Sequence, residues 1–511
     1  MPKPARTQVL IVGAGPTGLA LALWLRLQGV AVRIVDKAAE PGTTSRALAV
    51  QARTLELYGQ ADLADAVVAA GHKTGAVNFW ARGEKAARIP LSDIGEGLSP
   101  YPYLLIYPQD RHERLLIARL AALGVKVERP AEVEEVTLDE DGVTARWRGP
   151  SGAAKTVAAD YVCGCDGAHS VVRQAVGEGF PGGTYRQLFY VADVDARGPP
   201  ADGELHVDLD EADFLAVFPL DGAGRIRLIG TVRDERAEHP EALGFEDVSG
   251  NAIAHMKLEV GRVNWFSTYR VHHRVAERFR QGRAFLLGDA AHIHSPAGGQ
   301  GMNTGLGDAI NLAWKLAAVL QDRAAPSLLD SYEAERMAFA RRLVATTDRA
   351  FSFASAEGWA ADLVRTRVAP LVISRALSIE AVREFAYRTV AQITLNYRGG
   401  PLSLGKAGGV QGGDRLPWVV SEGHDSFAPL NRMTWQAHVF GLPHLEFEQN
   451  CAKAGLPLHI TPWREPHGAA GLARDAVYLT RPDSYVAVAD PEGEWGTIEA
   501  FAAERGLRLA G

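Results

Sequence analysis

A group of three glycines near the N-terminus constrains the fold more than any other feature of this sequence. The group consists of Gly13, Gly15 and Gly18. It follows an apolar stretch at residues 8–12 and opens a helical pattern that runs to about Leu27, and a second apolar stretch at residues 31–35 ends in Asp36. This order predicts a βαβ unit whose glycines allow a tight turn and close approach to a pyrophosphate. The helix N-terminus would face the phosphates and Asp36 an adenosine ribose, so the sequence predicts dinucleotide binding.

Length and charge narrow the remaining possibilities. A chain of 511 residues suggests two or three domains. The net charge of -7 argues against a nucleic-acid-binding surface. The uncharged run at residues 9–25 imitates a signal peptide, but its glycines and proline would break a membrane helix, so we expect a cytoplasmic protein without a membrane partner. Three cysteines, Cys163, Cys165 and Cys451, are too few for a disulfide framework and are expected to be buried thiols.

The residue pattern changes several times along the chain. Helical spacing is expected at residues 110–123, 308–320 and 330–349 and in a third region to about 393, with short strands between 125 and 162. Alternation between residues 185 and 269 predicts an antiparallel sheet inserted into the nucleotide-binding domain. A segment rich in Gly and Pro, residues 396–417, reads as a linker, and the rest reads as a small α/β domain.

Two further motifs lie where apolar strands end. Asp166-Gly167 follows one strand and precedes Ser170, which is expected to cap a helix; the residues alone indicate only a strand, a tight turn and a helix. Gly288-Asp289 ends another strand, at the edge where α/β sheets bind ligands. The loop that follows opens a helix near Gly305, and backbone N–H groups at a helix N-terminus favour a negative charge such as that of a reduced flavin.

Together these motifs resemble the single-component flavoprotein aromatic hydroxylases of the p-hydroxybenzoate hydroxylase and phenol hydroxylase type. Asp308, Asn311, Trp314 and Lys315, and Tyr332, Glu335 and Arg336, are supporting marks, and the resemblance covers residues 7 to 400. The tail, with Gly413-Asp414-Arg415 and Arg481-Pro482-Asp483, is similar to the thioredoxin-like domain of the long members that tailor aromatic polyketides. It lacks Cys-x-x-Cys, so a structural or interfacial role is expected.

The resemblance implies a set of FAD-binding residues. Gly13, Gly15, Gly18 and Asp36 would hold the ADP half, Arg46 and Gln109 the pyrophosphate or ribitol side, and Asp289 the ribitol. Asp166 is associated in the family with both FAD and the nicotinamide cofactor. Gly299, Gly301, Met302 and Asn303 form the loop at the pyrimidine edge of the isoalloxazine, and Pro296 would lie near the flavin face where oxygen reacts; no catalytic residue is otherwise identified.

The resemblance also implies a domain plan and an activity. It predicts a Rossmann-like FAD domain (1–180 and 275–345), a substrate-binding sheet (181–274), a helical segment (346–400) and a thioredoxin-like domain (401–511). Tightly bound, non-covalent FAD would be reduced by transient NADPH or NADH, and a flavin C4a-hydroperoxide formed with O2 would hydroxylate a phenolic or polyketide ring. Epoxidation, Baeyer–Villiger insertion and a non-catalytic FAD-binding protein stay open, as does a homodimer.

The substrate pocket is expected between the inserted sheet and the flavin. Phe214, Phe218 and Pro219 are the candidate lining residues, although ordinary core packing is the competing interpretation for the two phenylalanines. His292 and His294 stand two residues apart without a third ligand, so no metal site is expected.

Overall fold

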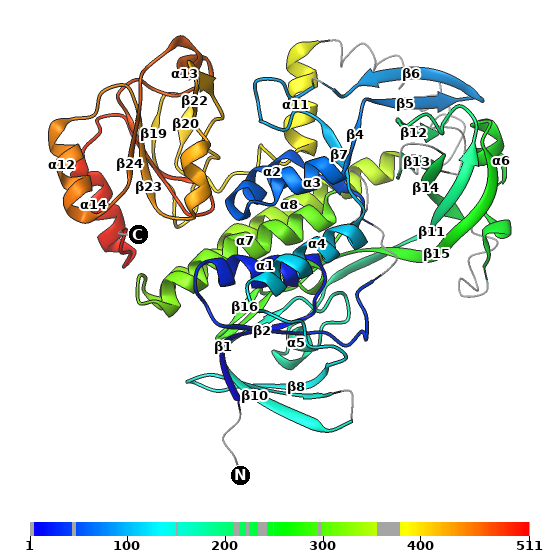
Figure 1. Cartoon of the computed structure of the whole chain (residues 1–511), viewed down its shortest axis with the longest axis horizontal. Helices are drawn as coiled ribbons and strands as arrows, with labels where there is room; N and C mark the ends of the chain where they lie inside the picture. Colours follow the sequence, from blue (N-terminus) through cyan, green and yellow to red (C-terminus); the bar gives the residue numbers. More distant parts are fainter. Residues whose placement is uncertain are drawn as a thin grey trace.

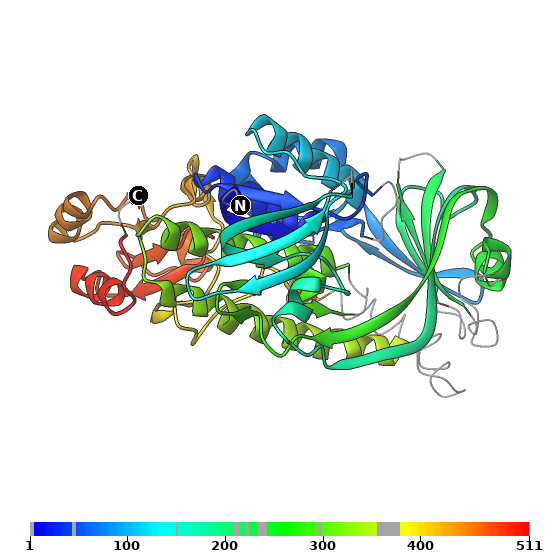
Figure 2. The same cartoon turned by 90° about the horizontal axis from the view of Figure 1, so that it is seen from below.

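The structure, a computed structural model, can be followed in Figures 1 and 2. It describes residues 5–42, 47–92, 94–149, 152–208, 214–220, 224–232, 243–248, 250–294, 299–354 and 379–509. Within them, three larger sheets surround a central layer of helices. The expected mixed α/β architecture with several sheets is confirmed.

The first sheet contains the predicted βαβ unit. Its strands, in spatial order, are β16 (Arg280–Gln281), β17 (Ala284–Leu286), β10 (Ala154–Gly164), β1 (Ala5–Val12) and β2 (Val32–Val35), with β9 (Val143–Arg148) beside β10 and β8 (Glu132–Leu138) beside β9. The four central strands run parallel, so their carboxyl ends meet at one edge. Helix α1 (Pro16–Leu27) covers one face, and its side chains from Gly18 to Leu25 are buried. The glycine turn and the strand before Gly288 therefore reach the same edge of one sheet.

The second sheet is antiparallel for most of its width. Its strands, in spatial order, are β18 (His292–Ile293), β15 (Glu259–Val275), β11 (Gly182–Arg197), β14 (Arg225–Val232), β13 (Leu215–Pro219), β12 (Leu205–Asp208), β5 (Ala76–Ala81) and β6 (Glu84–Pro90). The long strands β11 and β15 connect it to the nucleotide-binding region (Figure 2). Strands β5 and β6 come from far upstream, and β5 pairs with β12 in parallel, which the alternation between 185 and 269 does not indicate.

Helix α6 (Gly250–His255) covers the outer face of this sheet. Tyr190, Leu228 and Val217 on that face pack with Met256, just beyond the helix. Figure 1 shows α6 on the side away from the central helices. Because side chains alternate along a strand, the opposite face of the sheet turns toward the nucleotide-binding region.

The central layer joins these parts. It contains α2 (Ala52–Tyr58), α3 (Ala64–Ala70), α4 (Gln109–Ala122), α7 (Gly301–Leu320), α8 (Asp330–Ala354) and α11 (Glu380–Val390), beside a small sheet of β3 (Ala49–Val50), β7 (Leu104–Ile106) and β4 (His72–Thr74). Helix α7 begins before the predicted opening near Gly305, and therefore also before the helical spacing that was expected from 308. A Cβ at Gly305 would lie 2.3 Å from Thr17 Oγ1, so glycine permits the close packing of α7 on α1 at the cost of a weaker apolar pattern. The third expected helical region is α11, and residues 355–378 lie outside the described part.

The third sheet forms the C-terminal region. Its strands, in spatial order, are β20 (Val410–Gln411), β19 (Leu404–Ala407), β26 (Val486–Asp490), β25 (Val477–Thr480), β23 (Gln436–Phe440) and β24 (Leu458–Thr461). Helices α12 (Leu445–Ala454) and α14 (Trp495–Glu504) pack on one face, α13 (Glu465–Ala469) follows β24, and β21 (Val420–Ser421) pairs with β22 (His424–Asp425). Trp314 of α7 meets Trp435 edge-on at 5.7 Å between ring centroids, so this core is continuous with the central helices.

The three cysteines are free thiols. Cys163 lies in β10 and Cys451 in α12, both buried, and burial raises the pKa of the Cys451 thiol to about 12. A thiol that stays protonated at neutral pH is a poor nucleophile, which agrees with the lack of a dithiol motif. Among the helices of the described part, none is long and apolar enough to cross a membrane.

Candidate active site

The three glycines of the first turn have different surroundings. Gly13 has φ +100°, and a Cβ there would lie 2.2 Å from the carbonyl oxygen of Cys165; one at Gly18 would lie 2.0 Å from the carbonyl oxygen of Gly13. Gly15 has an ordinary φ of -76°, and its Cβ would meet no atom of the described residues within 4 Å. The outer two glycines are thus required by the chain itself, whereas the middle one faces open space, as expected where a pyrophosphate approaches.

Asp36 is held in place beside this turn. Its Oδ2 accepts a hydrogen bond from Ala14 N at 2.7 Å and its Oδ1 accepts one from Ala38 N at 2.8 Å. Arg129, which no sequence motif indicated, forms an ion pair with Oδ1 at 2.9 Å and donates to Ala14 O at 3.2 Å. Hydrogen bonds and an ion pair therefore connect the glycine turn, the Asp36 carboxylate and the Arg129 guanidinium.

Gln109 begins α4, where the sequence placed a helix. Its backbone N–H donates to Ala47 O at 3.1 Å, and its side chain donates to Glu113 Oε1 at 2.8 Å. Burial raises the pKa of Glu113 above its usual range, partly offset by Gln109 and Arg129. Arg46 and Pro296 lie outside the described residues, so their roles stay predictions.

Asp166 has a local partner. Its Oδ2 accepts from Val171 N at 2.7 Å and from Val172 N at 3.3 Å, at the start of α5 (Val171–Ala175), and Ser170 caps the same helix by accepting from Arg173 N at 3.0 Å. The predicted helix cap is confirmed. Asp166 Oδ1 is buried and has no hydrogen-bond partner among the described residues, and burial raises the pKa of this carboxyl. One oxygen thus holds the turn, while the other is left for a ligand.

The Gly288-Asp289 motif is built on a buried ionic group. Gly288 N donates to Asp308 Oδ2 at 3.0 Å, and Asp289 next to it is exposed. Asp308 also contacts His292 Nε2 at 2.7 Å and accepts from Arg336 Nε at 2.6 Å. Burial alone would raise the pKa of Asp308, but Arg336 and His292 outweigh it and lower the pKa. His292 thus has a carboxylate partner, and within the described residues no three metal-ligating side chains come together.

The first turn of α7 contains an asparagine, Asn303, whose side chain is fully hydrogen-bonded within the protein. Asn303 donates to Ala49 O at 2.9 Å and Gly299 O at 3.0 Å, and its Oδ1 accepts from Gln51 N at 2.9 Å and Thr54 Oγ1 at 2.8 Å. With both amide hydrogens and the oxygen engaged, this side chain does not have a donor left for a ligand. The backbone N–H groups at 301–303, which have no acceptor within the helix, are the groups suited to a negative charge.

The predicted substrate residues do not share one environment. Half-buried Phe218 packs with Leu48, Leu104, Ile106 and Leu220, beside Ala49, which Asn303 contacts. Pro219 is buried and points to the opposite face of the strand from Phe218. Phe214, directly before β13, is on the same face as Phe218. Phe218 is thus connected to the start of α7 through the segment that contains Ala49.

Cross-strand pairing shows which other side chains share the inner face of the sheet. Phe218 pairs with Arg227, Arg227 with Asp193, and Asp193 with Trp265. Arg227 donates to both oxygens of Asp193, at 2.5 and 2.8 Å, and lies 5.5 Å from the Trp265 ring centroid. On the same face the rings of Phe189 and Tyr269 are 5.7 Å apart. The sequence offers no local signal for this group, because it is assembled from four strands.

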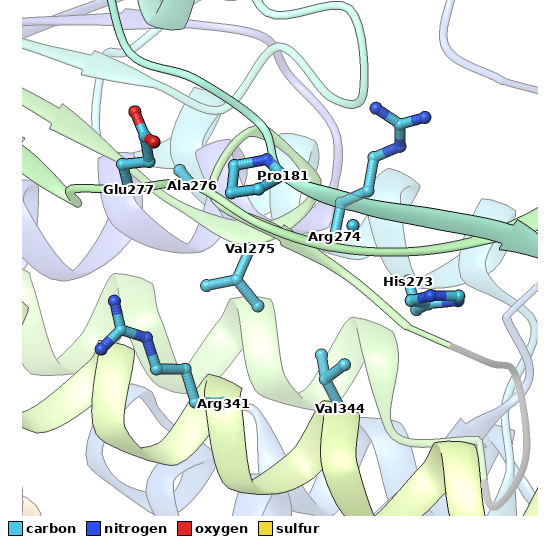
Figure 3. A pocket seen from close by; sticks show the side chains of 9 residues that line it. Pro181, His273, Arg274, Val275, Ala276, Glu277, Arg341 and Val344 are labelled. Carbon is cyan, nitrogen blue, oxygen red and sulfur yellow. The ribbon is translucent and has the colours of Figure 1, made fainter.

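A cavity of about 330 Å³ lies elsewhere, between the base of β15 and α8 (Figure 3). Its walls are Pro181, Gly182, His273, Arg274, Val275, Ala276, Glu277, Arg341 and Val344. Val275 and Val344 point toward each other across it, and Arg274 points away on the opposite side of the strand. None of the predicted substrate or cofactor residues lines this cavity, so we do not assign the substrate to it.

Comparison with known proteins agrees with these features. Residues 6–347 match the family described as FAD binding domain. The 6-methylpretetramide 4-monooxygenase of Streptomyces rimosus is 36% identical over 421 residues, which cover 80% of this chain and 73% of that protein. The OxyS anhydrotetracycline hydroxylase of the same organism has a TM-score of 0.77 at 30% identity, covering 98% of this chain and 99% of that one. Aklavinone-11 hydroxylase in complex with FAD and aklavinone has a TM-score of 0.80 at 25% identity, with the same coverage.

The relatives of this chain are thus similar to it in both sequence and fold. The chain itself contains the glycine turn, the Asp36–Arg129 pair and the N-terminal N–H groups of α7. The protein is an FAD-dependent oxidoreductase and belongs to the FAD-binding-domain family of flavin-dependent monooxygenases.

Proposed function

We propose that this enzyme hydroxylates a neutral polycyclic aromatic compound of the polyketide type, using O2 and NADPH or NADH. The observation that carries the proposal is the aromatic inner face of the second sheet, with Phe189, Phe218, Trp265 and Tyr269 on the side toward the α7 loop. Aromatic side chains stack on flat rings and exclude water. The relatives named above act on 6-methylpretetramide, anhydrotetracycline and aklavinone, which supports the same class here.

The charge on this face favours a neutral substrate. Arg227 is 2% exposed, and both of its donating groups that face Asp193 are matched by carboxylate oxygens. A buried guanidinium neutralised in this way does not attract a second carboxylate strongly. A small hydroxyphenyl acid, which needs a cation for its carboxylate, is therefore the less suited substrate.

The FAD would lie across the carboxyl edge of the first sheet. The N–H groups that follow Gly15 would hold the pyrophosphate, Asp36 the ribose, and Asp289, with the free Oδ1 of Asp166 nearby, the middle of the cofactor. Bound FAD supplies the reducing equivalents and the site at which O2 is activated. The N–H groups of Gly301, Met302 and Asn303 would stabilise negative charge on the pyrimidine edge, and the aromatic face would keep water from the reacting ring.

The domain plan is proposed with one addition. The FAD domain would comprise 1–180 and 275–345, the substrate domain 181–274 together with β5 and β6, a helical segment 346–400, and a thioredoxin-like domain 401–511. The order of elements in the last domain supports the thioredoxin-like assignment. It has β23, α12 and a parallel β24, then antiparallel β25 and β26, and finally α14. Free buried thiols and a nicotinamide reductant suit a cytoplasmic enzyme.

The test uses holoenzyme with a panel of tetracyclic aglycones and small phenols under 18O2. We expect the aglycones to stimulate NADPH or NADH oxidation and to gain one 18O atom as an aromatic hydroxyl. A product with the oxygen inserted into a ring or across a double bond would assign the chemistry to Baeyer–Villiger oxidation or epoxidation. Stimulated oxidation that yields only H2O2, or no stimulation by any compound, would refute the proposed hydroxylation.

A pair of adjacent variants tests the proposed substrate face. Trp265 and Phe266 are neighbours on β15 that alternate to opposite faces; Phe266 lies 6.1 Å from Tyr190, in the core under α6. Trp265→Leu should raise the KM for the aglycone, whereas Phe266→Leu should lower the melting temperature and leave KM unchanged. Equal effects of both variants on KM would contradict the assignment of the inner face.

A further inference from the structure

Helix α2 lies between the α7 loop and the C-terminal region, and its side chains contact both. We propose that the C-terminal region, residues 401–511, positions the flavin-facing end of α7 through α2, with Arg415 and Asn303 as the positioning residues at the two ends of this connection. The inference rests on the proposed placement of the flavin at residues 301–303. It assigns this region a role in cofactor binding although it lies outside the FAD-binding family match, which ends at residue 347.

The C-terminal end of the connection is a buried ion pair. Arg415 donates to Glu56 of α2 through Nη2 at 2.6 Å and Nε at 2.8 Å, and also to Leu98 O at 3.0 Å. Glu56 further accepts from Ser99 Oγ at 2.6 Å. The side chains of Glu56 and Arg415 are 1% and 9% exposed, so the pair is shielded from solvent and a two-pronged contact of this kind fixes orientation as well as distance.

A second side chain of α2 reinforces the contact. Arg53 donates through Nη2 to Asp483 O at 3.0 Å and to Ser484 Oγ at 3.1 Å, and its guanidinium lies 4.6 Å from the Tyr485 ring centroid. It also pairs with Glu56 at 3.1 Å. Because the two residues stand three apart on one helix, the C-terminal region holds a whole face of α2 rather than a single atom.

The other end of the connection is Asn303. Its Oδ1 accepts from Gln51 N and Thr54 Oγ1, at the first turn of α2 and directly beside Arg53. Its amide hydrogens hold Ala49 O and Gly299 O, which fixes the loop that precedes α7. A displacement of α2 is therefore passed directly to the residues whose N–H groups face the flavin.

A second route leads to the same turn of α7. Arg336 donates to Thr304 O and to Tyr397 Oη, each at 3.0 Å, and the Tyr397 ring lies 4.6 Å from that of Tyr485. Gln392, just after α11, donates to Thr304 Oγ1 at 3.2 Å. Arg53 of the first route and Tyr397 of the second both contact the Tyr485 ring, so the C-terminal region fixes the start of α7 from two sides.

A similar contact with a more exposed arginine serves as the control for the test. Arg398 also makes a two-pronged contact with a carboxylate, that of Asp414, at 2.5 and 2.8 Å, but no contact with α2 is part of it. We would compare Arg415→Gln, the conservative Arg415→Lys, Asn303→Ala and Arg398→Gln. Two quantities are measured: hydrogen exchange of the amides at 299–304 in flavin-free protein, and the FAD dissociation constant from flavin fluorescence.

We expect Arg415→Gln to speed exchange at 299–304 and to weaken FAD binding by roughly tenfold, within the usual coupling range for groups in one network. Arg415→Lys should recover part of both effects, because it keeps the charge but loses the planar fork. Arg398→Gln should lower the melting temperature and leave both quantities unchanged. In the double variant, Arg415→Gln should add little to Asn303→Ala.

Three results would overturn the inference. Unchanged exchange at 299–304 in Arg415→Gln would show that α2 does not carry the coupling. Equal changes in Arg398→Gln would reduce the effect to general destabilisation, and fully additive effects in the double variant would separate the two ends. If instead Asn303→Ala speeds exchange but binds FAD normally, the flavin placement in the proposed function is wrong, and the coupling has no role in cofactor binding.

Discussion

Alanine substitutions at the three glycines of the first turn should separate folding from cofactor binding. At Gly15 an added Cβ meets no atom within 4 Å in the part of the chain that the structure describes, and φ is ordinary. Alanine restricts the unfolded chain, which stabilises by about 0.4–1 kcal/mol, but it is a poorer N-cap than glycine by a similar amount. The free energy of unfolding of flavin-free Gly15→Ala should therefore stay within about 1 kcal/mol of the wild type.

The same substitution should weaken FAD binding strongly. If the pyrophosphate lies against Gly15, a methyl group there must displace it, and overpacking of this kind costs about 1–3 kcal/mol. That corresponds to a rise in the FAD dissociation constant of roughly 5- to 150-fold. Gly18→Ala should behave differently, because its Cβ would lie 2.0 Å from Gly13 O and must move the backbone, so flavin-free protein itself should lose about 1–3 kcal/mol or more.

The assay is urea unfolding of flavin-free protein followed by circular dichroism, combined with FAD titration by fluorescence quenching. Gly13→Ala serves as a second clash control, since its Cβ would lie 2.2 Å from Cys165 O and its φ is +100°. Equal destabilisation of the flavin-free protein by Gly15→Ala and Gly18→Ala would refute the assigned role of Gly15. Wild-type FAD affinity of Gly15→Ala would refute it as well.

Two further predictions concern buried charge. Burial, aided by His459, lowers the pKa of His438 from about 6.5 to about 3, so between these values the unfolded chain binds a proton that the folded chain does not, and stability falls as the pH falls. Between pH 7.5 and 5 this histidine should lower the free energy of unfolding by about 2 kcal/mol. His438→Leu should therefore flatten that part of the pH profile of urea unfolding. An unchanged slope would be inconsistent with a neutral buried imidazole. Arg481 and Lys315 share the buried carboxylate of Glu335, and although burial opposes it, these two cations lower the pKa of Glu335 to about 2. Glu335→Gln removes that carboxylate, so the free energy of unfolding measured by calorimetry should fall by about 3–5 kcal/mol. A fall of less than about 1 kcal/mol would contradict the geometry.

The sequence predicted those parts of the fold that depend on neighbouring residues. The first βαβ unit, the helix predicted at 110–123 and the Ser170 cap follow from local apolar spacing and turn chemistry. Strands β5 and β6 were missed as part of the second sheet, because nothing in their spacing says that they pair with a strand more than a hundred residues later. Local pattern sets what an element is, whereas its partner depends on packing over the whole chain.

The site shows the same division. The glycines and Asp36 were recognisable because one short motif holds them together, whereas Arg129 was not, since it reaches Asp36 from another segment. The predicted role of Asn303 beside the flavin stays a prediction, and its side chain is bound within the protein. In the sequence, Glu335, Lys315 and Arg481 indicated only a resemblance to the family. Their shared buried network is visible only in the three-dimensional structure.

The order of strands in the first sheet has a consequence for how the protein forms on the ribosome. Strand β1 pairs on one side with β10, about 150 residues later, and β10 pairs with β17, which follows after a further 120 or so. At a synthesis rate of about 5–20 residues per second, roughly 8–30 s pass between the synthesis of the apolar β1 and that of its neighbour β10. Arg53 waits longer, because its partner is 430 residues away. The nascent chain therefore exposes strand edges and apolar surface for most of its synthesis, and its yield in a cell should depend on chaperones that bind such segments before the last strands emerge.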